Sequence, residues 1–199
     1  MAKILALLGS PRVNGTNSLA IDQLLRGAAS CGDVEVQKIL LHKLKIAPCQ
    51  SCDSCLHTGR CHLRDDMEPI YEKIMDMDAF ILAAPVYFNG MSAQAKVMID
   101  RCQPFWSAKY VMKTDVFAGR RRPGIFIATG GQPLYDGQFI GSLHVVNLLF
   151  KMIGVKSIGN LTLPDLDARP LSTRPDDLSQ AFELGRQLIL NGEKKCERL

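Results

Sequence analysis

The sequence predicts an α/β fold in which helices cover both faces of one parallel sheet. Short apolar runs that are typical of buried strands alternate with amphipathic helical patterns, five of each, along the chain. The 199 residues are 47% hydrophobic and 22% charged, which is ordinary for a soluble globular protein. This length is enough for a single domain over residues 1–199 with a core on each side of the sheet.

The first half of the chain supplies three of the predicted strands, at residues 3–8, 34–40 and 78–84. The second of these alternates polar and apolar side chains, which is typical of a strand at the edge of a sheet. Pro85 is expected to end the third. The helices that follow these strands are predicted over about 17–30, from Asp66 as an N-cap, and from Ser92 onward.

The second half supplies two more strands, at residues 124–128 and 155–161. The helix after the first of these is marked by the spacing of Val145, Leu148, Leu149 and Met152. The last helix is predicted over about 176–190. Residues 105–121 and 162–175 are expected to follow a less regular path.

A polar loop from Gly9 to Ser18 joins the first strand to the first helix. Backbone N–H groups at a helix N-terminus point outward, and the helix dipole there favours an anion. The loop is rich in hydroxyls, carries one arginine and matches neither the Walker pattern nor the dinucleotide fingerprint. We interpret it as a cradle for a single terminal phosphate. The alternative is a strand-to-helix turn that Thr16 or Asn17 caps, with no ligand.

Two further loops follow predicted strands, at 85–91 and 129–132. Ligands of parallel sheets bind beyond the carboxyl ends of the strands, so all three loops are expected to converge on one crevice. The stretch from Pro85 to Gly90 offers an aromatic surface, an amide and backbone N–H groups, which suit a flat heteroaromatic ring. The alternative is that Tyr87 and Phe88 are ordinary core aromatics beneath a loop.

A long stretch without a sustained period, about 41–66, holds four of the seven cysteines. Loops of this length inside a compact domain are usually functional. The four thiols, at Cys49, Cys52, Cys55 and Cys61, lie within thirteen residues. Thiolates suit iron–sulfur clusters or zinc, and structural zinc usually takes two separated pairs of ligands. The compact run therefore favours a cluster, with zinc or no metal as alternatives.

Composition limits the class of partner. The net charge of +4 is mild, and the one basic run, Arg120 to Arg122, lacks the interleaved aromatics of a single-strand binder, so nucleic acid is not expected. A solvated charge run is the simplest interpretation of these arginines. The absence of a membrane-length apolar run and of a signal peptide pattern predicts a cytoplasmic protein without a membrane partner.

The order of these motifs is similar to that of the NAD(P)H-dependent FMN reductase family of the flavodoxin-like fold, and most of all to its iron–sulfur flavoprotein branch. The resemblance covers about residues 3–160. It is carried by the Gly9–Ser18 loop, the cysteine loop, Asp65-Asp66-Met67, Pro85-Val86-Tyr87-Phe88, Lys96 with Ile99-Asp100-Arg101, and Thr129-Gly130-Gly131. It implies a flavodoxin-like three-layer sandwich with a five-stranded parallel sheet in the order 2-1-3-4-5.

The resemblance also implies cofactor-binding residues. Those around the FMN phosphate would be Ser10, Arg12, Asn14, Thr16, Asn17 and Ser18. Those along the isoalloxazine would be Pro85, Val86, Tyr87, Phe88, Asn89 and Gly90, with Thr129, Gly130 and Gly131 on the other side. The ligands of a [4Fe–4S] cluster would be Cys49, Cys52, Cys55 and Cys61. No side chain need act as a catalytic acid or base, because FMN carries the chemistry.

The implied function is an FMN-dependent oxidoreductase or electron-transfer flavoprotein that couples the flavin to the cluster. NAD(P)H would be a donor, and partners would be a small redox donor or acceptor or a ferredoxin. Members of the branch form oligomers in which flavin and cluster meet across a subunit interface, so a homodimer or homotetramer is expected. Trp106 and Tyr110 are candidates for its contacts. The alternatives are a cluster-free NAD(P)H-dependent FMN or quinone reductase, and a non-enzymatic flavin- or zinc-binding redox sensor.

Overall fold

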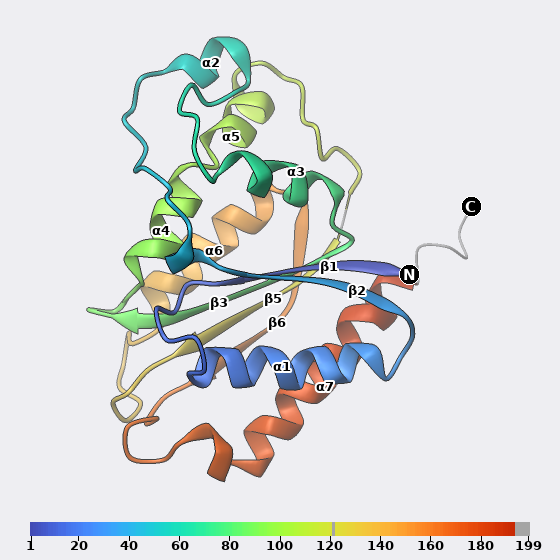
Figure 1. The fold of residues 1–199 in the computed structure, drawn as a ribbon, viewed down its shortest axis with the longest axis vertical. Coiled ribbons are helices and arrows are strands. Elements are labelled where there is room, and N and C mark those ends of the chain that lie inside the picture. Colours follow the sequence, from blue (N-terminus) through green and yellow to red (C-terminus); the bar gives the residue numbers. More distant parts are fainter. Residues whose placement is uncertain (121, 194–199) are drawn as a thin grey trace.

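The structure, a computed structural model that describes residues 1–120 and 122–193, contains the predicted parallel sheet between two layers of helices (Figure 1). Its parallel strands are β1 (Ala2–Leu8), β2 (Val34–Leu40), β3 (Ala79–Tyr87), β5 (Arg122–Thr129) and β6 (Val155–Leu163). They lie in the order β2-β1-β3-β5-β6, which confirms the predicted order and the edge position of the second strand. One detail differs, because a two-residue strand, β4 (Gly90–Met91), pairs antiparallel with the end of β3.

The helices divide between the two faces of the sheet (Figure 1). One face carries α1 (Thr16–Ala29) and α7 (Pro175–Glu193), and the other carries α3 (Glu68–Asp76), α4 (Ala93–Asp100), α5 (Gln103–Tyr110) and α6 (Ile140–Met152). Short elements are the five-residue helix α2 (Ser54–Thr58) and the 3-10 turns η1 (Leu41–Lys43) and η2 (Leu171–Thr173).

The strands supply side chains alternately to two cores. In β1, Leu5 and Leu7 belong to the core beneath α3 to α6, whereas Ile4, Ala6 and Leu8 belong to the core beneath α1 and α7. All five are at most 2% exposed. This two-residue period of a strand that is buried on both faces explains the continuous apolar run in the sequence.

Three boundaries differ from the predictions. Pro85 does not end β3, which continues to Tyr87. The last residue of β3 paired with β1 is Ala83, so Pro85 lies beyond that ladder and its missing N–H removes no hydrogen bond to β1. Asp66 is not the N-cap of α3, since the cap is Met67 and the Asp66 carboxylate accepts the Lys45 N–H at 2.7 Å.

The third boundary concerns residues 105–121. Their first part, 105–110, is helical and forms most of α5, in contrast to the predicted irregular segment. The weak amphipathic pattern arises because this helix packs against the cysteine loop as well as the core. Residues 162–175 begin with the end of β6 and include η2, so only the stretch between them follows the predicted irregular path.

The basic run is only partly the solvated charge run that its composition predicts, because Arg120 is exposed whereas Arg122 is buried. Arg120 donates to the Met75 carbonyl at 2.7 Å. Arg122 is buried and donates to the carbonyls of Ile74, Met77 and Ile153. Both arginines therefore tie β5 to neighbouring segments. Arg121, the middle residue of the run, lies outside the described residues.

No helix within the described part of the chain combines the length and the apolar character that crossing a bilayer requires.

Candidate functional site

The loop between β1 and α1 is anchored where it leaves the sheet. The Gly9 N–H donates to the Ala83 carbonyl and the Ser92 hydroxyl donates to the Gly9 carbonyl, both at 2.7 Å. A Cβ at Gly9 would lie 2.8 Å from the Cβ of Ala95, which is too close for any side chain. The requirement for glycine here comes from the close approach of α4.

Helix α1 begins without a side-chain cap. Its N-cap is Gly15 in an extended conformation, so the alternative in which Thr16 or Asn17 caps the turn is wrong. The N–H groups of Thr16 and Asn17 have no acceptor among the described residues. Unpaired N–H groups at the start of a helix form a ready site for an anion.

Asn17 connects this loop to the loop after β5. It is 3% exposed, and its Nδ2 donates to Thr129 Oγ1 at 2.9 Å, although 112 residues separate the two positions. Its Oδ1 is buried without a hydrogen-bond partner among the described residues. A buried acceptor without a partner is uncommon in a folded protein and is explained by a missing donor. The position is therefore suited to a ligand hydroxyl.

The resemblance implies Arg12 as the positive charge at this loop, but a second cation, Lys38, also lies beside it. Arg12 is exposed, and its side chain makes no hydrogen bond to another described residue. Lys38 of β2, which sequence reasoning missed, donates to Ser18 Oγ at 2.8 Å and to Asp22 at 2.6 Å. It brings a positive charge to the first turn of α1 from a neighbouring strand. No sequence motif marks it, because only the parallel pairing places β2 beside α1.

The β3–β4 hairpin carries the predicted aromatic residues at the left of Figure 1. Tyr87 pairs with Gly90, and the two residues between them, Phe88 and Asn89, have φ of 50° and 59°. Two-residue hairpin turns with positive φ favour Asn and Gly, so Phe88 is strained there. Phe88 is fully exposed and Tyr87 is 51% exposed, which shows that the alternative of ordinary core aromatics is wrong.

The loop after β5 contacts this hairpin. The Tyr135 hydroxyl donates to Asn89 Oδ1, a contact that sequence reasoning missed because 46 residues separate the two positions. Thr129 and Gly130 are buried. A Cβ at Gly131 would lie 2.2 Å from Oδ2 of the exposed Asp167, so the side chain of Asp167 would have to move to admit one.

The three strand-end loops thus converge, as predicted. Asn17 joins the first to the third, Tyr135 joins the third to the second, and the Ser92 hydroxyl joins the segment after the hairpin back to Gly9. Together they lie side by side at the carboxyl ends of β1, β3 and β5, the position at which parallel sheets bind ligands, and this region is called the crevice below.

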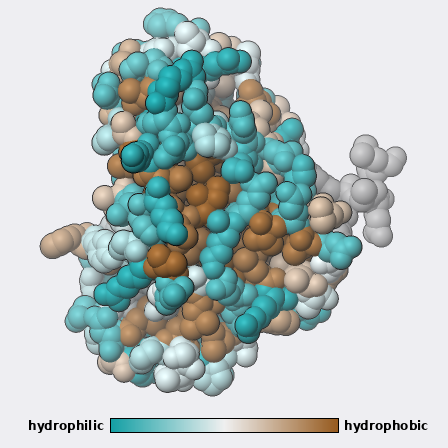
Figure 2. All heavy atoms as spheres, viewed as in Figure 1, coloured by the Kyte–Doolittle hydropathy of each residue, from teal (hydrophilic) through white to brown (hydrophobic). Residues whose placement is uncertain are grey.

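A second candidate site lies in the cysteine loop, around α2 at the top of Figure 1. All four predicted ligands, Cys49, Cys52, Cys55 and Cys61, line one cavity of about 220 Å³. All four thiols are free, and the first two are exposed. The surrounding surface at the top of Figure 2 is mainly hydrophilic.

The backbone of this loop is unusual. Ser51 and Asp53, on either side of Cys52, have φ of 49° and 58°, in the left-handed region. Asp53 is followed by the helical residue Ser54. Adjacent residues of opposite handedness direct their N–H groups into one concavity, an arrangement found at many iron–sulfur and phosphate sites. Strained residues of this kind concentrate at ligand sites.

The thiols also interact with nearby side chains. Cys52 Sγ lies 2.9 Å from His62 Nδ1. Burial raises the pKa of Cys55, and the neighbouring thiols raise it further. Among the described residues, no three His, Cys, Asp or Glu side chains surround one position for a single metal ion. A zinc ion needs all its sulfur ligands at about 2.3 Å from one point, whereas a cluster with several irons spreads its thiolates over a wider cavity.

Helix α5 supports the cysteine loop from below. The Ser107 hydroxyl donates to the Cys55 carbonyl at 2.7 Å. Met112, just beyond the helix, packs over Gly59, where its sulfur would lie 3.3 Å from a Cβ. The segment predicted to be irregular therefore supports the loop that carries the thiols.

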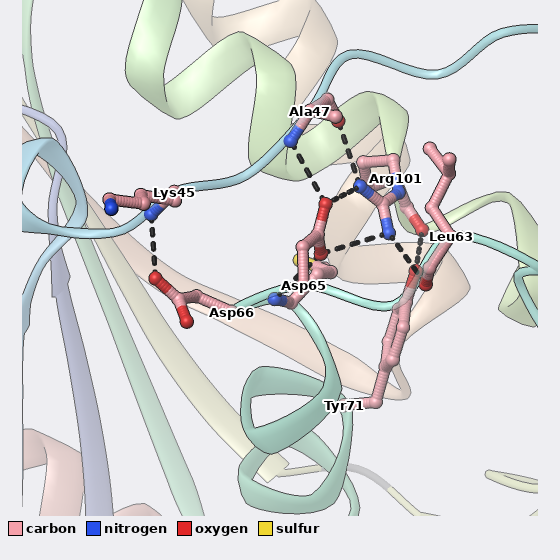
Figure 3. A network of polar contacts seen from close by, with 8 residues as sticks. Lys45, Ala47, Leu63, Asp65, Asp66, Tyr71 and Arg101 are labelled. Atoms are coloured by element: carbon pink, nitrogen blue, oxygen red, sulfur yellow. Dashed lines mark hydrogen bonds and ion pairs between the residues drawn. The ribbon is translucent and has the colours of Figure 1, made fainter.

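The base of the loop is closed by a polar network (Figure 3). Asp65 accepts hydrogen bonds from the N–H groups of Ala47 and Met67, at 2.9 and 3.0 Å. It also pairs with Arg101 at 2.6 Å, and Arg101 donates in turn to the carbonyls of Ala47 and Leu63. The segments before Cys49 and after Cys61 are thus held together, and hydrogen bonds between Lys45 and Asp66 join the same two segments.

Comparison with solved structures identifies the class of fold. The flavodoxin-like WrbA-like protein of Agrobacterium tumefaciens superposes with a TM-score of 0.59 at 15% identity, over 98% of this chain and 99% of its own. This likeness shows the fold, a flavodoxin-like α/β sandwich.

The sequence profile of the NADPH-dependent FMN reductase family matches residues 2–159, and the chain belongs to this family. An iron–sulfur flavoprotein of Methanocaldococcus jannaschii is 37% identical over 102 residues, 51% of this chain and 52% of that protein. The chain thus spans about half the length of that relative. The iron–sulfur flavoprotein of Methanosarcina thermophila is 32% identical over 154 residues, 72% of this chain and 76% of that protein. The predicted resemblance is confirmed.

Proposed function

We propose that this chain is a flavin-dependent oxidoreductase that binds FMN in the crevice and a [4Fe–4S] cluster in the cysteine cavity. The observation that carries the proposal is the convergence of three strand-end loops around unpaired donors and acceptors. The family to which the chain belongs supports FMN and a nicotinamide donor, and the names of its relatives support the cluster.

The residues of the crevice suit the parts of FMN. The free N–H groups of Thr16 and Asn17 would hold the phosphate, with Lys38 nearby as a positive charge. Asn17 Oδ1 would accept a hydrogen bond from a hydroxyl of the ribityl chain. Pro85 to Gly90 would lie along the ring and Thr129 to Gly131 on its other side.

When bound, FMN would supply hydride and single-electron chemistry, and a cluster would supply one-electron chemistry. The protein's own part is to position these groups. The Asn17–Thr129 and Tyr135–Asn89 hydrogen bonds fix the separation of the three loops, so the ring meets a preorganised surface. No described side chain is needed as an acid or base.

The cysteines suit the cluster in kind and in arrangement. Four thiols line one cavity, and thiolates are the usual ligands of iron–sulfur clusters. None of the residues that line this cavity belongs to the three loops of the crevice. As the resemblance to iron–sulfur flavoproteins implies, electrons would pass between the flavin of one subunit and the cluster of another, in a homodimer or homotetramer to which the exposed Trp106 and Tyr110 would contribute.

Anaerobic purification tests the proposal. We expect bound FMN, iron and sulfide in equal amounts with a broad absorption shoulder beside the flavin bands, and oxidation of NADPH or NADH with a small acceptor or a ferredoxin. Light scattering should give a dimer or tetramer. Flavin bands without iron would contradict the cluster and leave a cluster-free reductase. Zinc without turnover would favour a redox sensor. Colourless protein that takes up no added FMN would overturn the function.

A further inference from the structure

Arg101 is the most deeply buried charged side chain of the cysteine region. The residue is 1% exposed and its side chain is fully buried, yet it lines the cysteine cavity. Its partner Asp65 pairs with it from the other side and does not line the cavity. The positive member of the pair is therefore the one that borders the thiols.

The guanidinium has more donors than the protein satisfies. Two of its nitrogens donate to Asp65 and to the carbonyls of Ala47 and Leu63 (Figure 3). The third, Nε, is buried and has no acceptor among the described residues. A buried N–H without an acceptor costs free energy and needs an explanation. A negatively charged sulfur group in the adjoining cavity supplies one.

The other charged side chains that line the cavity are more exposed to solvent than Arg101. Asp53 is exposed, and Asp100 is half-exposed and pairs with Lys96 at 2.7 Å. Water and salt screen such charges, whereas a buried charge acts through a medium of low dielectric constant. Of the charged groups that line the cavity, Arg101 is therefore the one that water and salt screen least. Burial opposes the charge of Arg101, but Asp65, Tyr71 and Cys61 outweigh it and raise its pKa, so it stays protonated.

We propose that Arg101 is a positioning residue of the sulfur site: with Asp65 it closes the base of the cysteine loop, and its positive charge raises the reduction potential of the group bound there. The inference rests on the proposed cluster. Reduction adds a negative charge to a site that already carries four thiolates, and net charge and hydrogen bonding set the potential of such clusters. A buried cation beside the site favours the reduced form.

The test is a redox titration of the anaerobically purified protein, followed by the visible and electron paramagnetic resonance spectra of the cluster. R101Q removes the charge and should shift the midpoint potential to a more negative value. D65N removes the opposing charge and should shift it to a more positive value. R101K keeps the charge but not the planar fork, and its potential should lie between those of R101Q and the wild type. A purely structural role does not predict opposite signs for the two partners.

Arg122 offers a matched control. It is also buried, donates to backbone carbonyls and has an unpaired Nε, but it does not line the cysteine cavity. R122Q should lower the unfolding temperature without moving the potential or the iron content. If R101Q instead loses its iron and sulfide while R122Q keeps them, the result supports the role of Arg101 in closing the base of the cysteine loop. The midpoint potentials of D65N and R101K then measure the effect of charge.

Two results would overturn the inference. One is an R101Q protein that keeps its cluster at the wild-type potential, and the other is a shift of R101Q and D65N in the same direction. Equal loss of iron from R101Q and R122Q, with equal fall in unfolding temperature, would reduce Arg101 to a general structural residue. Wild-type protein without iron and sulfide is a different failure, because it removes the proposed cluster before any variant is compared.

Discussion

The crevice at the strand ends and the cysteine loop reach their geometry in different ways. The crevice is built on strands whose backbone pairing fixes the positions of its loops, and single hydrogen bonds such as Asn17–Thr129 only adjust them. The cysteine loop has no such scaffold, and its two ends meet mainly through the side chains of Arg101, Asp65 and Asp66. A site on a sheet edge should therefore tolerate side-chain changes better than one closed by a buried ion pair.

The largest expected effect is the loss of the cluster from the cysteine cavity with FMN still bound in the crevice. Cys52→Ala removes a proposed cluster ligand and should abolish bound iron and sulfide while FMN stays bound, because the crevice shares no residue with the cysteine cavity. Iron, sulfide and flavin assays measure it. Cys31→Ala, a half-buried cysteine outside the loop, is the control and should keep both groups. An absorption shoulder that persists in the Cys52 variant would contradict the ligand assignment.

The next largest effect should weaken FMN binding and leave the iron content unchanged. Asn17→Ala removes the hydrogen bond to Thr129 and the acceptor at Oδ1, and the loss of buried hydrogen bonds costs roughly 1–3 kcal/mol. Since 1.4 kcal/mol is about tenfold in affinity, FMN binding should weaken by about 10- to 100-fold. Fluorescence titration with FMN measures it, and the iron content should not change. Asn147→Ala, on the exposed face of α6, should bind FMN normally. Unchanged affinity in the Asn17 variant would place FMN elsewhere.

A third effect is the pH dependence of the stability that the Asp65–Arg101 ion pair gives the protein. Burial raises the pKa of Asp65, but the hydrogen bond from Arg101 and those from Ala47 and Met67 outweigh it, so the folded pKa is below the ordinary 3.8. The stabilisation is therefore present above the unfolded pKa and is lost as pH falls through the folded one. The unfolding temperature of the wild type should exceed that of D65N at pH 7, and the two unfolding temperatures should converge below about pH 4. A difference that persists undiminished at pH 3 would contradict the ion pair.

The smallest expected effect concerns the contact between the loops. Tyr135→Phe removes the hydrogen bond to Asn89 from an exposed pair, which is worth about 0.5–1.5 kcal/mol at most. FMN affinity should fall by no more than about tenfold, and the unfolding temperature should hardly change. Tyr110→Phe, on α5, is a suitable control. A loss as large as that of the Asn17 variant would mean that the hairpin is held mainly by Tyr135.

Sequence patterns predicted the strands, the polar loop after the first strand and the compact set of thiols, because strand periodicity, glycine placement and cysteine spacing are local properties. The order of the strands was predicted from the family resemblance. Only the tertiary structure decided that α5 supports the cysteine loop, that Lys38 lies beside α1, and that Arg101 lies buried beneath the thiols. These depend on contacts between segments far apart in the chain, for which the sequence holds no local signal. The same reason explains the exposed Phe88, since an aromatic in a local pattern does not reveal that a tight hairpin turns it outward.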